Sequence, residues 1–95
     1  MQKNKTSLTS YKRHQVELLQ TLYQLSSTEN LKLFLDDLLT PAESQAIAER
    51  WQAAKLLHQG LTQREVAKAL GLSVTTVTRV ARCLADPKGG YRRVL

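Results

Sequence analysis

Residues 63–81 are predicted to form two short helices joined by a tight turn, and this stretch constrains the fold more than any other. Thr62 and Glu65 have the spacing of a capping box, in which each side chain bonds the backbone of the other residue. Gly71 can take the positive φ that a bend after a helix requires. Ser73 is a favoured N-terminal cap for the second helix. Together these signals predict a helix-turn-helix.

Both predicted helices have an apolar face. In the first helix three apolar residues share one side, with a small residue at the expected crossing point. They are Val66, Ala67 and Leu70. In the second helix the apolar residues recur at three- and four-residue spacing. They are Val74, Val77, Val80 and Ala81. Two amphipathic helices of this kind are expected to pack across the turn.

The other face of the second helix carries short hydroxyl side chains and arginines, which suit contacts with base edges and phosphates in a major groove. The candidate DNA-binding residues are Gln63, Arg64, Lys68, Ser73, Thr75, Thr76, Thr78, Arg79 and Arg82. Three alternatives stay open. The first is that one of the threonines serves the helix cap rather than DNA. The second is that Gln63 and Arg64 form only a solvated first turn. The third is that the whole motif is a structural hairpin in a larger bundle.

The charge distribution supports a polyanionic partner. The chain of 95 residues has a formal net charge of +6. Residues 61–95 hold seven Lys and Arg against two acids, whereas residues 1–60 hold seven against six. The basic surplus therefore coincides with the helix-turn-helix and favours nucleic acid. A solvated basic tail is the alternative for Lys3, Lys5, Arg92 and Arg93.

Several classes of protein are not expected from this sequence. Cys83 is the single cysteine, so no intrachain disulfide can form, which fits a reducing cytoplasm. Neither a signal peptide nor an apolar run of the ~20 residues needed for a membrane span is evident. No spacing of His14, His58 or paired carboxylates predicts a metal site or an enzyme.

Three further helices are predicted before the motif, after a flexible arm over residues 1–10. They cover 11–25, about 30–38, and 41–58. Thr40, Pro41 and Glu43 mark the start of the third, since Thr40 caps, Pro41 suits the first helical position and Glu43 completes a capping box.

The domain is predicted to span residues 11–95, with dimerisation helices over 11–58, the helix-turn-helix over 62–84 and a C-terminal turn over 85–95. The third helix is apolar around most of its circumference, and so short a chain has little with which to cover it. The first and third helices are therefore expected to pack against a second subunit in a homodimer. Tyr91, Val94 and Leu95 are expected on the core.

The pattern of helices and motifs resembles the tryptophan repressor superfamily, and it looks most like the YerC/YecD-like branch. The resemblance covers nearly everything from Tyr11 onward. The residues that carry it are 39–43 (LTPAE), Arg50, 56–65 (LLHQGLTQRE) and 77–84 (VTRVARCL), with Tyr91 downstream. It implies an all-α intertwined homodimer that binds a double-stranded DNA operator.

The resemblance also implies a slot for L-tryptophan as corepressor. Arg50 and Arg79 would sandwich the indole, carbonyls around Leu38, Leu39 and Thr40 of the partner subunit would receive the ammonium, and Thr76 would line the slot. Val80 and Cys83 border the same place, but here the chain departs from the classical repressor, which has glycine and serine at these positions.

Other interpretations of the slot and of the whole chain stay open. Arg50 can instead pair with Glu43, Glu49 or Asp37, and Arg79 can contact a phosphate. For the whole chain, the alternatives are a DNA-binding regulator that needs no ligand and a helical module that docks protein.

Overall fold

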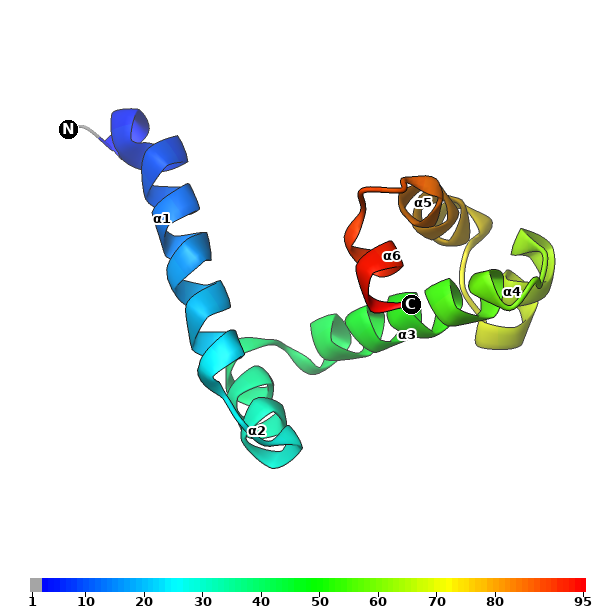
Figure 1. The fold of residues 1–95 in the computed structure, drawn as a ribbon, viewed down its shortest axis with the longest axis horizontal. Helices are drawn as coiled ribbons and strands as arrows, with labels where there is room; N and C mark the ends of the chain where they lie inside the picture. Colours follow the sequence, from blue (N-terminus) through cyan, green and yellow to red (C-terminus); the bar gives the residue numbers. More distant parts are fainter. Residues whose placement is uncertain (1–2) are drawn as a thin grey trace. The chain divides into compact units, whose positions relative to one another are not determined.

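The computed structural model describes residues 3–95, with side chains from Ser10 onward. This range is helical, with no strand, and confirms the predicted all-α fold class (Figure 1). The helices are α1 (Lys3–Gln24), α2 (Thr28–Leu38), α3 (Pro41–His58), α4 (Gln63–Leu70), α5 (Val74–Ala85) and α6 (Gly90–Val94). They form two compact units, one of α1 and α2 ending at Leu39, and one of α3 to α6 beginning at Thr40.

The first unit begins its helix earlier than the sequence predicts. α1 starts at Lys3 rather than at Tyr11, so most of the expected flexible arm is helical, while residues 1–2 lie outside the described range. No Gly or Pro interrupts the chain before Tyr11, so nothing local stops the helix from extending. Ser27 caps α2, since its Oγ accepts from the Asn30 N–H at 3.0 Å.

The first unit has no core of its own among its described side chains. None of residues 10–39 is buried. The half-buried apolar residues of its two helices are Leu18, Leu22, Leu31, Phe34 and Leu35, and Leu25 is half-buried between the helices. Other large apolar side chains of α1 are exposed, including Val16, Leu19 and Tyr23. These two helices therefore present apolar surface that residues 10–39 themselves do not cover.

The second unit starts where the sequence predicts. Thr40 Oγ1 accepts from the Glu43 N–H at 3.1 Å, and the Thr40 N–H donates to Glu43 Oε1 at 2.9 Å. Pro41 occupies the first turn of α3. Because the box joins residues three apart, the local sequence is enough to set this helix start.

The core of the second unit lies where α3, α4 and α5 meet. Its buried members are Ala53, Ala54, Val66, Ala67, Val77 and Val80. The turn between α4 and α5 is made by Gly71, whose φ is 68°. Ala67, at 8% exposure, gives the small contact that lets α5 cross α4 closely. The predicted helix-turn-helix is thus present and packed on α3.

The C-terminal turn packs only in part. Tyr91 of α6 contacts the core, and Arg92 Nε donates to the Leu84 carbonyl at 2.7 Å, at the end of α5. Val94 is 70% exposed and Leu95 is also exposed, so the expectation that both pack on the core is wrong. α6 is a single turn of five residues, and such a turn directs only one or two side chains inward.

Candidate nucleic-acid interface

α5 has one face in the core and the opposite face in solvent. Val77 and Val80 are buried against α3 and α4. Thr75, Arg79 and Arg82 are exposed. Thr76 and Thr78 are half-buried at the margin. The outward face of this helix is therefore basic and polar, as the sequence predicts.

Two of the threonines already have partners within the motif. Thr76 belongs to the cap of α5, because its N–H donates to Ser73 Oγ at 3.1 Å and its own Oγ1 accepts from Ser73 Oγ at 3.0 Å. Thr78 Oγ1 donates to Gln63 Oε1 at 2.9 Å, which joins α5 to the first residue of α4. Among the three threonines, Thr75 is the one that is exposed rather than half-buried.

Val74 is exposed although its spacing assigned it to the apolar face. Its side chain is 56% exposed. At 100° per residue, Val74 lies roughly a quarter turn from the centre of the stripe made by Val77, Val80 and Leu84. Residue spacing alone placed Val74 with the apolar residues, but this angle puts it at the margin of the apolar stripe. An apolar side chain at the start of a recognition helix suits contact with a thymine methyl group.

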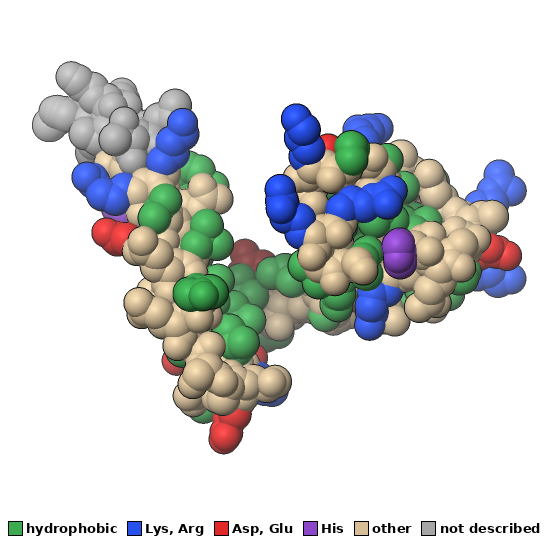
Figure 2. Space-filling model, in the orientation of Figure 1, with side chains coloured by type: hydrophobic (Ala, Val, Ile, Leu, Met, Phe, Trp, Pro, Cys, Tyr) green, Lys and Arg blue, Asp and Glu red, His purple; other side chains and the backbone are tan. Residues whose placement is uncertain are grey.

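A shallow groove runs along the exposed side of α5. Its volume is about 390 Å³. It is lined by Val74, Thr75, Thr78, Arg79 and Arg82. Figure 2 shows Lys and Arg side chains over the unit of α3 to α6, with acidic side chains sparse among them. Hydroxyl and guanidinium donors next to an apolar side chain match what a base edge and its phosphates offer.

α4 adds exposed polar residues to the same motif. Gln63 and Arg64 lie in its first turn and Lys68 in its last, and all three are exposed. Arg64 and Lys68 are four residues apart and so share one side of the helix. Val66 and Ala67 face the core. The structure therefore leaves all three polar residues accessible.

The resemblance assigns Arg50 and Arg79 to the two sides of a tryptophan slot. Arg50 and Arg79 are both exposed, on helices that pack together. Within the described side chains Arg50 makes no ion pair with Glu43 or Glu49. Glu43 is engaged in the cap of α3, and Glu49 accepts from Gln45. Neither of these two carboxylates therefore holds Arg50.

Val80 and Cys83, which the resemblance also places at the slot, differ in exposure. Val80 is only 2% exposed and belongs to the core cluster. Cys83 is exposed and borders a different hollow. Leu38 is 48% exposed, Leu39 is half-buried, and the Thr40 carbonyl already accepts from the Ser44 N–H. Because the resemblance takes Leu38, Leu39 and Thr40 from the partner subunit, the slot stays a prediction.

The hollow beside Cys83 has an aromatic lining that the sequence analysis missed. Its volume is about 670 Å³. The Trp51 and Tyr91 rings stack with centroids 6.3 Å apart, and Lys55 Nζ lies 5.8 Å from the Trp51 ring. No sequence signal pairs residues so far apart in the chain, because the contact depends on how α6 folds back onto α3.

Metal and membrane functions find no support in the part of the chain that the structure describes. No cluster of three or more His, Cys, Asp or Glu side chains is placed to hold a metal ion in that part. None of the helices within residues 3–95 combines the length and apolarity needed to cross a bilayer.

Comparison with known proteins gives consistent matches. Uncharacterized protein YerC of Bacillus subtilis (strain 168) is 33% identical over 79 residues, which cover 83% of this chain and 76% of that protein. The Trp operon repressor homolog of Xylella fastidiosa (strain M23) is 39% identical over 70 residues, which cover 73% of this chain and 76% of that protein. No solved structure matches significantly. Residues 13–95 match the family model described as Trp repressor protein. The chain belongs to the Trp repressor family, whose members are transcription regulators rather than enzymes.

Proposed function

We propose that this protein is a sequence-specific regulator of transcription that binds a double-stranded DNA operator through α5 and acts as a repressor in the cytoplasm. The observation that carries the proposal is the two-sided burial of α5. Val77 and Val80 hold the helix to the core, while Arg79 and Arg82 are exposed. A recognition helix must be held from behind and open in front to enter a major groove. Relatives named Trp operon repressor homolog support repression.

We propose further that the protein acts as a homodimer. The exposed apolar residues of α1 and the lack of a buried side chain in residues 10–39 support a second subunit as cover. A twofold dimer carries two copies of α5. Two recognition helices match two half-sites about 34 Å apart, one turn of the DNA helix.

Duplex binding is expected to weaken steeply with salt. Each subunit offers four cations on the motif, namely Arg64, Lys68, Arg79 and Arg82. A dimer that uses all of them would show a slope of roughly −7 in log affinity against log salt, since each neutralised phosphate adds about −0.9. Fluorescence anisotropy with a labelled duplex, titrated at several salt concentrations, measures this slope.

Two variants sharpen that measurement. Lys68→Ala removes one phosphate contact per subunit and should reduce the slope by about two in the dimer. Lys32→Ala is the control, because Lys32 lies on α2 and pairs with Asp36 at 2.6 Å. A slope near zero for the unmodified protein would contradict DNA binding and favour a hairpin that docks protein.

A regulator that needs no small ligand is the second candidate function. Val80 supports it, because this buried, branched side chain stands where the classical repressor has glycine beside the slot that the resemblance implies. Cys83 also supports a regulator without a ligand, since a thiol is a weak hydrogen-bond partner for an amino acid in the implied slot. L-tryptophan as corepressor remains the competing proposal, supported by the exposed Arg50 and Arg79.

Isothermal calorimetry separates these two candidates. We expect no saturable heat when L-tryptophan is added to the protein at millimolar concentration, because a branched side chain replaces the glycine that the classical repressor has beside the slot. The matched variant is Arg50→Ala, which should behave in the same way. Saturable heat that Arg50→Ala abolishes would establish the corepressor and reject the ligand-independent regulator.

A further inference from the structure

One hydrogen bond joins the two helices of the motif through side chains alone. Thr78 Oγ1 donates to Gln63 Oε1 at 2.9 Å, and the two residues are 15 apart in sequence. Gln63 is the first residue of α4, while Thr78 lies in the second turn of α5. Gln63 is exposed and Thr78 is half-buried. The bond therefore lies at the surface edge of the helix-turn-helix.

This bond changes what each side chain can offer to DNA. The Thr78 hydroxyl hydrogen is already used, so the hydroxyl has no donor left for a base edge. A glutamine amide has one acceptor oxygen and two N–H donors. With Oε1 engaged by Thr78, the remaining capacity of Gln63 is mainly that of a donor.

A group that mainly donates suits a phosphate better than a base. Reading adenine with glutamine requires the amide oxygen and the amide nitrogen together. A phosphate oxygen only accepts, and phosphate contacts set the position of a protein on the duplex without reading its sequence. Among the described residues, none accepts a hydrogen bond from Gln63 Nε2 within the chain. The amide also sits beside Arg64, which adds positive charge at the same turn.

We propose that Thr78 is a positioning residue, which fixes the Gln63 amide so that Gln63 Nε2 donates to a DNA phosphate, and that Thr78 itself does not read a base. This proposal rests on the proposed DNA-binding function. It gives Gln63 the role of contacting a phosphate and Thr78 the role of positioning Gln63. If Thr78 reads no base, the residues left to read bases directly on α5 are those with exposed side chains, which are Val74, Thr75, Arg79 and Arg82.

A double-mutant cycle tests the proposal. The probes are a duplex that the unmodified protein selects from a random-sequence pool, and an unrelated duplex. Thr78→Val removes the hydroxyl but keeps the shape, and it should weaken binding to both duplexes alike, by about threefold to tenfold. Gln63→Ala should cause a similar loss. Because Thr78 acts through Gln63, the double variant should bind as Gln63→Ala does.

Thr78→Ser is the matched control, since serine keeps the hydroxyl and should keep most of the affinity. Thermal unfolding of each variant shows whether the fold is unchanged, so a loss of affinity in a folded variant is a loss of positioning. A purely structural bond would move the melting temperature without the non-additive pattern in DNA affinity.

Three results would overturn the proposal. They are losses that add in the double variant, unchanged affinity in Thr78→Val, and relaxed selectivity at one base pair in Thr78→Val, which would show that Thr78 reads a base. In each case the unmodified protein still binds duplex DNA, so the proposed function survives. If the unmodified protein shows no salt-sensitive duplex affinity, the proposed function fails and this role fails with it.

Discussion

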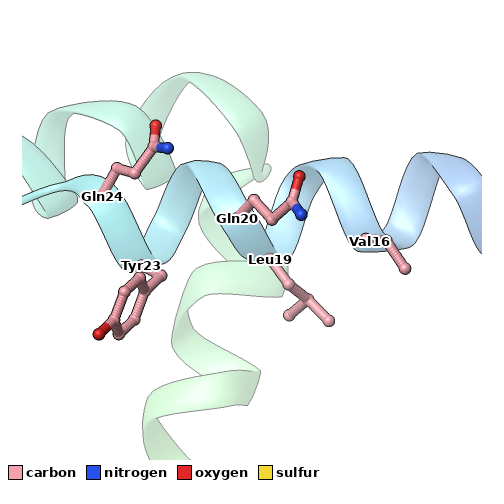
Figure 3. Close-up of a pocket in the computed structure, with 5 residues that line it drawn as sticks. All are labelled: Val16, Leu19, Gln20, Tyr23 and Gln24. Carbon is pink, nitrogen blue, oxygen red and sulfur yellow. The ribbon is translucent and has the colours of Figure 1, made fainter.

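Replacing Leu19 by aspartate is expected to convert the proposed homodimer to a monomer and to weaken the proposed operator binding by at least about 100-fold. Leu19 lies on one side of α1 with Val16 and Tyr23, at three- and four-residue spacing, and all three are exposed. Figure 3 shows these three side chains directed to the same side of α1, with Gln20 and Gln24 on the other edge of the hollow that they line.

The physical reason is that a charge cannot be buried at an apolar contact without a partner. An unpaired carboxylate at the centre of a subunit interface costs several kcal/mol. Loss of the dimer removes the linkage between two recognition helices, and linked sites gain about 10² to 10⁴ in affinity over single ones. Light scattering measures the mass, and anisotropy with the selected duplex measures the affinity.

Thr21→Asp is the matched control for this experiment. Thr21 is two residues from Leu19, which places it about 160° away around the helix. It is exposed and its hydroxyl donates to the Glu17 carbonyl at 2.9 Å. This variant should remain a dimer and bind DNA nearly as the unmodified protein does. A Leu19→Asp protein with the dimer mass and full affinity would show that this face of α1 is not an interface.

Val77→Asp is expected to unfold the unit of α3 to α6. Val77 is fully buried, in a cluster that also includes Ala53, Ala54, Val66 and Val80. A buried polar group without a hydrogen-bond partner costs about 2–7 kcal/mol. The whole stability of a small domain is about 5–15 kcal/mol. Far-ultraviolet circular dichroism with urea titration should therefore show an early transition or none.

Thr75→Asp separates stability from function in the same helix. Thr75 is exposed on α5, two residues from Val77 and on the other side. Its aspartate variant should unfold at nearly the urea concentration of the unmodified protein. Its duplex affinity should fall, because a carboxylate would then face the phosphates. Equal urea midpoints for Val77→Asp and the unmodified protein would show that Val77 is not a core residue.

Local signals in the sequence were enough to place most helix starts. The caps of α3, α4 and α5 each join a hydroxyl to a backbone N–H three residues later: Thr40 to Glu43, Thr62 to Glu65 and Ser73 to Thr76. Gly71 has the positive φ that its position predicts. Family membership could also be predicted, because motifs such as these recur in a fixed order along the chain.

The start of α1 and the exposure of Val74 could not be predicted in the same way. α1 begins at Lys3, since no Gly or Pro before Tyr11 breaks the helix. Val74 fits the apolar spacing but lies at the margin of the stripe, and whether a marginal residue is covered depends on the neighbouring helix. The spacing of residues along a helix predicts the direction of a side chain, but it does not predict whether another helix covers that side chain.

By itself, the sequence determined that this chain is all α, where its capped helices begin, and that a basic, hydroxyl-rich helix follows a glycine turn, because each of these follows from contacts within about four residues. Only the tertiary structure decided that Thr78 holds Gln63 and that Trp51 stacks on Tyr91. These contacts join residues that are distant in sequence, so they depend on the angles at which α3, α4, α5 and α6 cross, and no local rule specifies those angles.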